Sequence, residues 1–250
     1  MQIIVPAAGR GSRFAAQGYS QPKPVIEIMG KPLIKWSTDG MKGLEDVHYI
    51  FLVLQEHIEE HEIDKKLQKL YPECTIVPVK GVTEGAASTV LLAKEHLNQE
   101  ESTFIVNCDN FFFLDVPRMM SFLQPDTAAL ILYIAANHPH WSYVQVGANG
   151  DALRVAEKEV ISDKAIVGCH YFSKAKYFIE AAEYMIANNI RTRGEFYISP
   201  VFNILIDQGK RVQTLPCDLH FSLGTPEEAQ VFETLFSTTP GNCIDHHVVD

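Results

Sequence analysis

The residues best suited to phosphate chemistry lie within the first 24 positions of the chain. Residues 3–5 form a short apolar stretch that predicts a strand. The loop after it consists of small residues and one arginine: Ala7, Ala8, Gly9, Arg10 and Gly11. Small side chains let a backbone approach a ligand closely, and the N–H groups of such a loop can converge on phosphate oxygens. We therefore interpret residues 7–11 as a cradle for phosphate groups.

Two cations follow this loop. Arg13 carries a planar guanidinium that can hold a phosphate through two hydrogen bonds, and Lys23 carries a compact charge on a long side chain. Pro22 and Pro24 flank Lys23, and a residue before proline is disfavoured in the helical conformation, so Lys23 should lie in an extended segment. Arg13 and Lys23 are the predicted catalytic residues.

Two common glycine-rich phosphate loops do not explain the pattern. No Gly-Lys-Ser/Thr sequence follows at the spacing of a Walker loop. Phe14 stands where a dinucleotide-binding fingerprint would have its third glycine. An ordinary turn after a strand remains the alternative for a Gly-x-Gly pattern considered alone.

The elements that must position these residues alternate between strand and helix over the first half of the chain. The expected strands are 3–5, 47–54, 74–79 and 103–106, and the expected helices are 33–41, 56–70 and 86–97. This alternation predicts a parallel sheet with right-handed crossovers. Ligands bind at the carboxyl ends of the strands of such a sheet, and three segments with suitable chemistry should meet there: 7–13, 81–87 and 107–110.

The second half of the chain changes character. Strand 128–135 is followed by short strands at 143–146, 153–156 and 165–172, with Asn149-Gly150-Asp151 as a hairpin turn. We expect these short strands to form a small antiparallel insertion. The remaining expected elements are helices 178–188 and 196–208, strand 211–215, and a last helix with Thr225 as its N-cap and Pro226 at its first position.

Asp109 is the candidate metal ligand. It follows an apolar strand that should be buried, at the edge of the sheet where the phosphates would lie. A carboxylate there is a hard oxygen ligand suited to Mg²⁺, although an aspartate that caps a turn is the alternative. At 81–87, an N-terminal cap of the following helix by Thr83 or Glu84 is likewise the structural alternative to a binding role.

The distribution of charge favours a small anionic ligand. The chain has a net charge of −10, which argues against nucleic acid as a generic partner. Residues 1–35 nevertheless sum to +4, which leaves −14 on the other 215 residues. The charged residues of this segment are Arg10, Arg13, Lys23, Lys31, Lys35 and Glu27. A local positive patch on an acidic chain fits a small polyanion better than a polymer, and a chance surface cluster is the alternative.

Composition and cysteine usage also indicate where in the cell the protein works. No apolar run approaches the roughly 20 residues of a membrane span, and the N-terminus lacks the pattern of a signal peptide. Five cysteines are scattered without a Cys-x-x-Cys pair: Cys74, Cys108, Cys169, Cys217 and Cys243. This usage favours reduced thiols, so we expect a cytoplasmic protein that does not bind membranes.

The compound pattern Ala-Ala-Gly-x-Gly-x-Arg, followed ten residues later by Pro-Lys-Pro, resembles the signature of the nucleotidyltransferases that join a nucleoside triphosphate to a sugar phosphate. The resemblance runs from about Gln2 to Glu233 and is most similar to members found with bacterial capsule and lipopolysaccharide biosynthesis. It implies a Rossmann-like α/β fold: a mixed, mainly parallel sheet flanked by helices, with a small antiparallel insertion. It implies one domain over 1–250, with a nucleotide-binding part at about 1–135, an acceptor-binding lobe at about 136–235 and a polar tail at 237–250.

The resemblance also assigns roles to residues outside the first loop. It implies that Glu84, Gly85 and Ala86 approach the nucleotide, that activity uses Mg²⁺ on Asp109, and that the partners are an NTP and a small phosphorylated acceptor. The residues it implies at the acceptor are Tyr143, Glu157, Lys158, Gly168 and Glu195. One position departs from the family pattern, because Ser222 stands where a second metal-binding aspartate is usual, so the second metal ligand stays uncertain.

Two other functions remain open from the sequence. A glycosyltransferase of the same nucleotide-binding architecture would consume a sugar nucleotide, but Asp109-Asn110-Phe111 is not Asp-x-Asp and Pro-Lys-Pro has no role there. A non-catalytic, ligand-sensing relative would fit Ser222 but not the retained Arg13 and Lys23. The sequence identifies neither the base nor the acceptor, and a homo-oligomer is compatible with it.

Overall fold

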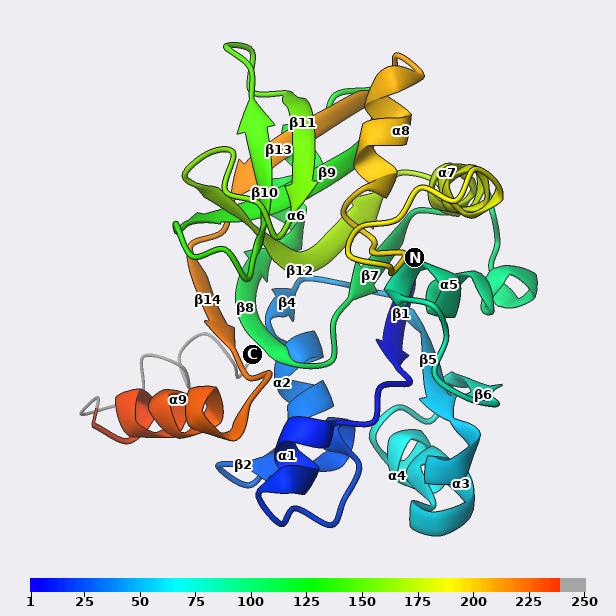
Figure 1. Ribbon diagram of the computed structural model, residues 1–250, viewed down its shortest axis with the longest axis vertical. Helices are drawn as coiled ribbons and strands as arrows, with labels where there is room; N and C mark the ends of the chain where they lie inside the picture. Colours follow the sequence, from blue (N-terminus) through cyan, green and yellow to red (C-terminus); the bar gives the residue numbers. More distant parts are fainter. Residues whose placement is uncertain (239–250) are drawn as a thin grey trace.

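A computed structural model describes residues 1–238 of the chain. One nine-stranded sheet runs through this part of the protein (Figure 1). Its first half is parallel and has the order β7-β1-β5-β6. These strands are β1 (Gln2–Ala7), β5 (His48–Leu54), β6 (Thr75–Val79) and β7 (Thr103–Val106). The mixed α/β fold and the four alternating strands predicted for the first half are confirmed.

The second half of the sheet is mostly antiparallel. β12 pairs antiparallel with β7, β9 and β10, β10 pairs antiparallel with β11, and β13 runs parallel to β9. The strands are β9 (Thr127–Ala135), β10 (Ser142–Val146), β11 (Ala152–Glu157), β12 (Lys164–Phe172) and β13 (Arg211–Pro216). The strands expected to form a small insertion therefore extend the central sheet, because β12 hydrogen-bonds directly to β7.

Short strands below this sheet were not predicted. β8 (Asn110–Asp115) pairs with β14 (Leu219–Ser222) and with β4 (Met41–Lys42). β2 (Glu27–Ile28) and β3 (Lys31–Pro32) form a separate hairpin. The β8–β14 pairing has a direct consequence for the site, since its register sets Ser222 opposite Asn110, one residue after Asp109.

Helices cover both faces and the lower end of the molecule (Figure 1). They are α1 (Ser12–Ala16), α2 (Leu33–Asp39), α3 (Gln55–His61), α4 (Ile63–Leu70), α5 (Ala86–Leu91), α6 (Val116–Phe122), α7 (Ala175–Ala187), α8 (Val201–Asp207) and α9 (Pro226–Thr238). Two short 3₁₀ turns cover Lys23–Val25 and Lys94–His96. The N-cap predicted at Thr225 is confirmed, because its Oγ1 accepts a hydrogen bond from the Glu228 amide at 3.2 Å.

Three predicted helices were wrong in extent. The helix expected over 56–70 is two helices, since Glu62 adopts a left-handed conformation with φ of 51°. The helix expected over 86–97 ends at Leu91 and is followed by a 3₁₀ turn. The helix expected over 196–208 begins only at Val201, and Pro200 disfavours the helical conformation of the residue before it.

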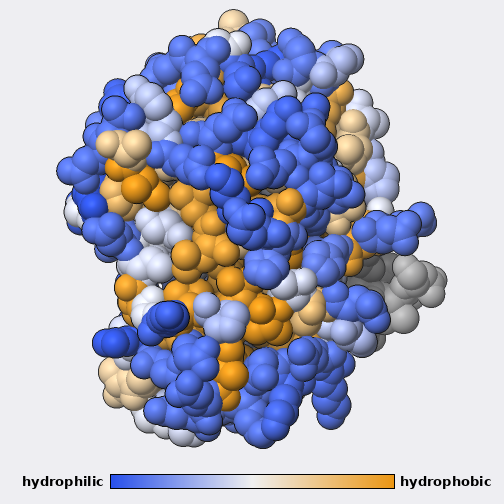
Figure 2. All heavy atoms as spheres, turned by 90° about the vertical axis from the view of Figure 1, so that its right-hand side faces the viewer, coloured by the Kyte–Doolittle hydropathy of each residue, from blue (hydrophilic) through white to orange (hydrophobic). Residues whose placement is uncertain are grey.

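Apolar side chains are buried on both faces of the parallel strands. Ile4 packs into one cluster with α7 and α8, whereas Ile3 and Val5 point to the opposite face and into a second cluster. Alternation along a strand produces this division, and coverage on both faces is why the parallel strands read as continuous apolar runs. Figure 2 shows hydrophobic side chains reaching the surface at mid-height of one face, between hydrophilic regions above and below.

A third cluster, here called the Trp36 cluster, joins the two ends of the described chain. It consists of Phe14, Ile26, Ile28, Leu33, Trp36, Phe111, Leu223, Ala229 and Phe232. Trp36 packs edge-on against Phe232 with the ring centres 5.0 Å apart, and Gln17 donates a hydrogen bond to Glu227. Helices α1 and α2 are thereby held against α9. The polar tail predicted over 237–250, with Cys243, lies from residue 239 onward outside the described residues.

Candidate functional site

The small-residue loop after β1 forms one side of a cavity of about 600 Å³ at the carboxyl ends of the parallel strands. Gly11 has φ of 62°, and a Cβ on it would lie 2.8 Å from the Cβ of Lys23. Glycine at this position therefore allows both the left-handed turn and the close approach of the Lys23 segment. The loop and the lysine predicted to serve one ligand line the same cavity.

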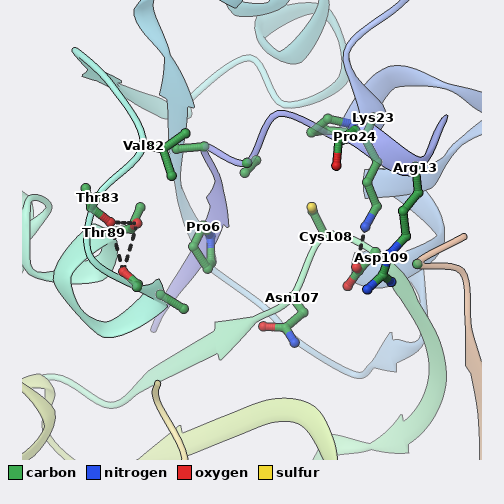
Figure 3. A pocket seen from close by; sticks show the side chains of 18 of the residues that line it. Pro6, Arg13, Lys23, Pro24, Val82, Thr83, Thr89, Asn107, Cys108 and Asp109 are labelled. Carbon is green, nitrogen blue, oxygen red and sulfur yellow. Dashed lines mark hydrogen bonds and ion pairs between the residues drawn. The ribbon is translucent and has the colours of Figure 1, made fainter. Parts of the chain in front are cut away.

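Lys23 forms an ion pair with Asp109 across this cavity (Figure 3). Burial alone would lower the pKa of Lys23, but the charge of Asp109 and its hydrogen bond outweigh burial, so the pKa is raised and the amine stays protonated. Arg13 extends toward the same carboxylate from α1 (Figure 3). Burial raises the pKa of the neighbouring Cys108 thiol to about 12, which keeps it neutral beside the charged pair.

The opposite wall of this cavity is the segment between β6 and α5. The hydroxyls of Thr83 and Thr89 both donate to the carbonyl oxygen of Gly85, at 2.9 and 3.2 Å (Figure 3). Gly85 has φ of 143°, and a Cβ on it would lie 2.4 Å from the carbonyl oxygen of Phe196. The Phe196 amide donates to Glu84 O at 2.9 Å, and its carbonyl accepts from the Ala87 amide at 3.0 Å. These bonds tie the wall to the segment before α8.

A second cavity of about 480 Å³ lies next to the first. In it, Glu157 accepts hydrogen bonds from the hydroxyls of Ser142 and Ser199, the latter at 2.5 Å. Lys158 donates to the Tyr197 hydroxyl, and its Nζ lies 4.4 Å from the centre of the Tyr197 ring. Lys158 has φ of 56°, an uncommon conformation for a residue with a side chain. The Glu-Lys pair thus presents a fixed negative and a fixed positive charge to this cavity.

The two cavities are parts of one cleft. The residues that line both are Arg13, Ala86, Asn107, Asp109 and Gly224. Gly168 lets the side chains of Asn107 and Asn110 pack closely against the sheet at this boundary, because a Cβ on it would lie 2.2 Å from Asn110 Nδ2 and 2.5 Å from Asn107 Nδ2. A ligand in the first cavity and a ligand in the second would therefore meet beside Arg13 and Asp109.

Most residues predicted for the site line this cleft. Those on the first cavity are Ala7, Ala8, Gly9, Gly11, Arg13, Lys23, Gly85, Ala86 and Asp109. Glu157, Lys158, Gly168 and Ser222 line the second cavity. Glu195, expected at the acceptor, lines the first cavity instead.

Three predicted residues do not line either cavity. Arg10 pairs with Glu56, with Arg10 Nε 3.7 Å from Glu56 Oε1, and Glu84 pairs with Arg191 at 2.9 Å. Tyr143 is fully buried, and its hydroxyl donates to the carbonyl oxygen of His138 at 2.8 Å.

Sequence reasoning missed several residues of the second cavity, among them Ser199, His170 and Glu228. His170 is 5% exposed, and burial lowers its pKa to about 4, so it is neutral near pH 7. Glu228 has a sequence signal of another kind, since it lies three positions after the N-cap Thr225. That spacing predicts a helix cap rather than a cleft residue, so only the fold reveals its position.

Known proteins resemble this chain in sequence along most of its length. A family model described as nucleotidyl transferase matches residues 2–219. The uridylyltransferase AglF of Haloferax volcanii, which acts on UTP and glucose 1-phosphate, is 25% identical over 91% of this chain and 93% of its own. The bifunctional protein GlmU of Thermoanaerobacter pseudethanolicus is 22% identical over 92% of this chain. The chain spans about half the length of this GlmU, at 50%.

Solved structures agree with the fold. A nucleoside-diphosphate-sugar pyrophosphorylase from Vibrio cholerae RC9 superimposes with a TM-score of 0.77 and 25% identity, over 93% of this chain and 99% of its own. An inositol-1-phosphate CTP transferase from T. maritima has a TM-score of 0.74 at 17% identity, over 96% of each chain. Within residues 1–238, no helix has the length and apolar character needed to cross a membrane. The family match covers most of the sequence, and the chain belongs to the nucleotidyl transferase family.

Proposed function

We propose that this protein transfers a nucleotidyl group from an NTP to a sugar phosphate or a similar small phosphate, releasing pyrophosphate. An oxygen of the acceptor phosphate attacks the α-phosphorus of the NTP, the bond from that phosphorus to the bridging oxygen breaks, and pyrophosphate leaves. The observation that carries the proposal is the two-part cleft, whose cavities share Arg13 and Asp109. Two substrates bound side by side would meet at these residues.

The chain's residues have separate tasks in this scheme. The backbone of residues 7–11 binds the triphosphate, and Lys23 and Arg13 neutralise the charge that develops on it. Gly85 and Ala86 bound the nucleotide on the opposite wall. In the second cavity, Lys158 binds the acceptor phosphate, while Glu157 accepts hydrogen bonds from acceptor hydroxyls. Catalysis is then positioning and charge neutralisation without a covalent intermediate.

The donor set fits Mg²⁺, and we propose it as the cofactor. Asp109 offers a hard carboxylate at the junction of the cavities, and the cation it now contacts is Lys23. No group of three or more His, Cys, Asp and Glu side chains suited to a metal occurs among residues 1–238. Mg²⁺ often takes only one or two protein carboxylates and completes its shell with water and substrate phosphates. When bound, Mg²⁺ would neutralise phosphate charge and hold the triphosphate in place.

The test is pyrophosphate release from each of the four NTPs with a panel of sugar phosphates and other small phosphates, followed by mass spectrometry of the product. The expected result is equimolar pyrophosphate and a nucleoside-diphosphate product for one pairing. Hydrolysis of, or glycosyl transfer from, a sugar nucleotide with no pyrophosphate formed would instead identify a glycosyltransferase. Nucleotide binding without turnover would identify a non-catalytic sensor.

The proposed cellular role rests on a resemblance of two short sequence segments. His138-Pro139-His140-Trp141-Ser142-Tyr143 and Gly194-Glu195-Phe196-Tyr197 resemble members found with bacterial surface polysaccharide synthesis. We include in the proposal that the product is an activated precursor for a capsule or lipopolysaccharide. Loss of that polysaccharide in a deletion strain, restored by the wild-type gene but not by a Lys23→Ala gene, is the expected outcome.

A further inference from the structure

Glu228 occupies a place in the cleft that its sequence context does not suggest. It lies in the first turn of α9 and lines the second cavity. Its Oε2 accepts hydrogen bonds from Ser222 Oγ at 2.8 Å and from the Thr225 amide at 3.0 Å. Both bonds end on the same oxygen, and no hydrogen bond within residues 1–238 ends on Oε1. Oε2 therefore completes the helix cap, and these two bonds orient the carboxylate at the wall of the second cavity.

The carboxylates of Glu228 and Asp109 converge on Gly224. A Cβ placed on Gly224 would lie 3.2 Å from Glu228 Oε2, 3.4 Å from Asp109 Oδ2 and 3.5 Å from Ser222 Oγ. Glycine leaves the space between the two acids free of any side chain. The backbone fixes this meeting, since the Leu223 amide donates to the Asp109 carbonyl at 2.8 Å. The junction of the two cavities thus has two carboxylates, one of which is oriented by a hydroxyl.

We propose that Glu228 is the second protein carboxylate of the divalent-cation site, acting with Asp109, and that Ser222 is a positioning residue for it. The inference rests on the proposed function, because the cation would come with the triphosphate. Mg²⁺ takes six oxygen ligands and usually keeps several waters, so two carboxylates plus phosphate oxygens are a sufficient set. Ser222 supplies no negative charge where the family pattern has an aspartate, and the carboxylate of Glu228 would supply that charge instead.

The Lys23–Asp109 ion pair sets the order of binding. In the empty cleft, Lys23 neutralises one of the two carboxylates. A bound triphosphate offers Lys23 a second anion and adds oxygen ligands, so both carboxylates become available to the cation. Affinity for the cation should therefore be low in the free protein and rise when nucleotide binds.

The test is Mn²⁺ binding, followed by electron paramagnetic resonance, to the full chain with and without the NTP that binds best in a metal-free thermal-shift screen. With that NTP bound, Glu228→Gln should weaken the affinity for Mn²⁺ by about 10²-fold. Ser222→Ala should weaken it by about tenfold, in the range expected for loss of a partner that orients a ligand. Glutamine keeps an oxygen for the Thr225 amide, so the cap and the melting temperature should be retained. Glu227→Gln, on the same turn and paired with Gln17, is the matched control and should leave Mn²⁺ affinity unchanged.

The outcomes separate the two proposals. If Glu228→Gln and Glu227→Gln bind Mn²⁺ equally well in the presence of an NTP that both bind, the metal assignment is overturned and the proposed function stands. If no NTP binds to the wild-type protein, both are overturned. An effect of Glu228→Gln equal to that of Asp109→Asn, with melting temperatures unchanged, supports the shared site.

Discussion

The two sides of the cleft are built in different ways. The first cavity, the proposed nucleotide side, consists largely of backbone and small residues in two short segments, 6–13 and 82–89, with Lys23 added from a proline-flanked turn. The second cavity, the proposed acceptor side, is built from side chains on β10, β11, β12, β14, α9 and the segment before α8. A backbone cradle suits a group common to all nucleotides, whereas converging side chains suit the selection of one acceptor among many. Variation on the two sides should therefore have different kinetic consequences.

The largest effect is expected from the cation on the nucleotide side. Lys23→Ala should lower turnover by about 10²–10³, the typical cost of one preorganised electrostatic contact in a transition state. Steady-state pyrophosphate release is the measurement. Lys35→Ala is the matched control, since Lys35 belongs to the same basic segment but pairs with Asp39 at 2.6 Å. Near-normal turnover in a folded Lys23→Ala protein would remove Lys23 from the proposed chemistry.

A change on the acceptor side should separate the two substrates. Lys158→Ala should raise the KM of the acceptor by about 10²-fold, because a charged contact to phosphate is lost, and leave the KM of the NTP within about twofold. Lys164→Ala, which removes a lysine paired with Asp163 at 2.7 Å, is the control and should change neither KM. Equal increases for both substrates would contradict the division of the cleft into two sides.

The contact between Gly85 and the Phe196 backbone joins the two sides of the cleft and can be tested through the stability of the protein. Gly85→Ala should destabilise the protein by about 1–3 kcal/mol, because φ of 143° is unfavourable for alanine and its Cβ would meet the Phe196 carbonyl at 2.4 Å. Urea unfolding measures the change. Gly81→Ala is the control on the same loop, since a Cβ there meets nothing within 4 Å. Equal stability of the two variants would show that position 85 tolerates a Cβ and that its contact with Phe196 does not require glycine.

The smallest effect concerns pH and the buried histidine of the acceptor side. Burial lowers the pKa of His170 in the folded chain to about 4, from its ordinary value of 6.5. The unfolded chain therefore binds more protons between pH 6.5 and 4, and stability falls as pH drops through that window. His170→Phe should reduce the loss between pH 7 and pH 5 by about 2 kcal/mol. Urea unfolding at both pH values checks this, and exposed His96→Asn should leave the loss unchanged.

The same division explains which parts of the site could be predicted. The nucleotide side follows from contiguous sequence: small residues after an apolar strand, then two cations. Each is a local pattern, so the sequence alone predicts that Arg13 and Lys23 lie at the cleft that they line in the structure. Roles on the acceptor side were inferred from resemblance. Glu228 escaped notice because its local pattern is that of a helix cap, and only the β8–β14 pairing brings it beside Asp109.

The secondary structure likewise divides into elements that the sequence predicts and elements that it does not. Long apolar strands of the parallel half were predicted correctly, since burial on both faces leaves a strong local signal. The short strands β4, β8 and β14 were not predicted, because pairing with distant segments stabilises them rather than their own sequence. The helix expected over 56–70 failed at Glu62, where a left-handed residue interrupts a pattern whose apolar spacing continues across the break.

The Trp36 cluster has a consequence for the synthesis of the protein. It supports α1 and the turn that bears Lys23, yet Leu223, Ala229 and Phe232 come from the far end of the described chain. The Gln17–Glu227 hydrogen bond in the same region spans 210 positions. A ribosome releases residues 14–36 long before their partners exist, so Phe14 and Trp36 stay exposed while the central sheet can already assemble. The nascent chain can therefore hold Arg13 and Lys23 in place only after residues 223–232 have been synthesised, and until then this exposed apolar segment is a binding site for a chaperone.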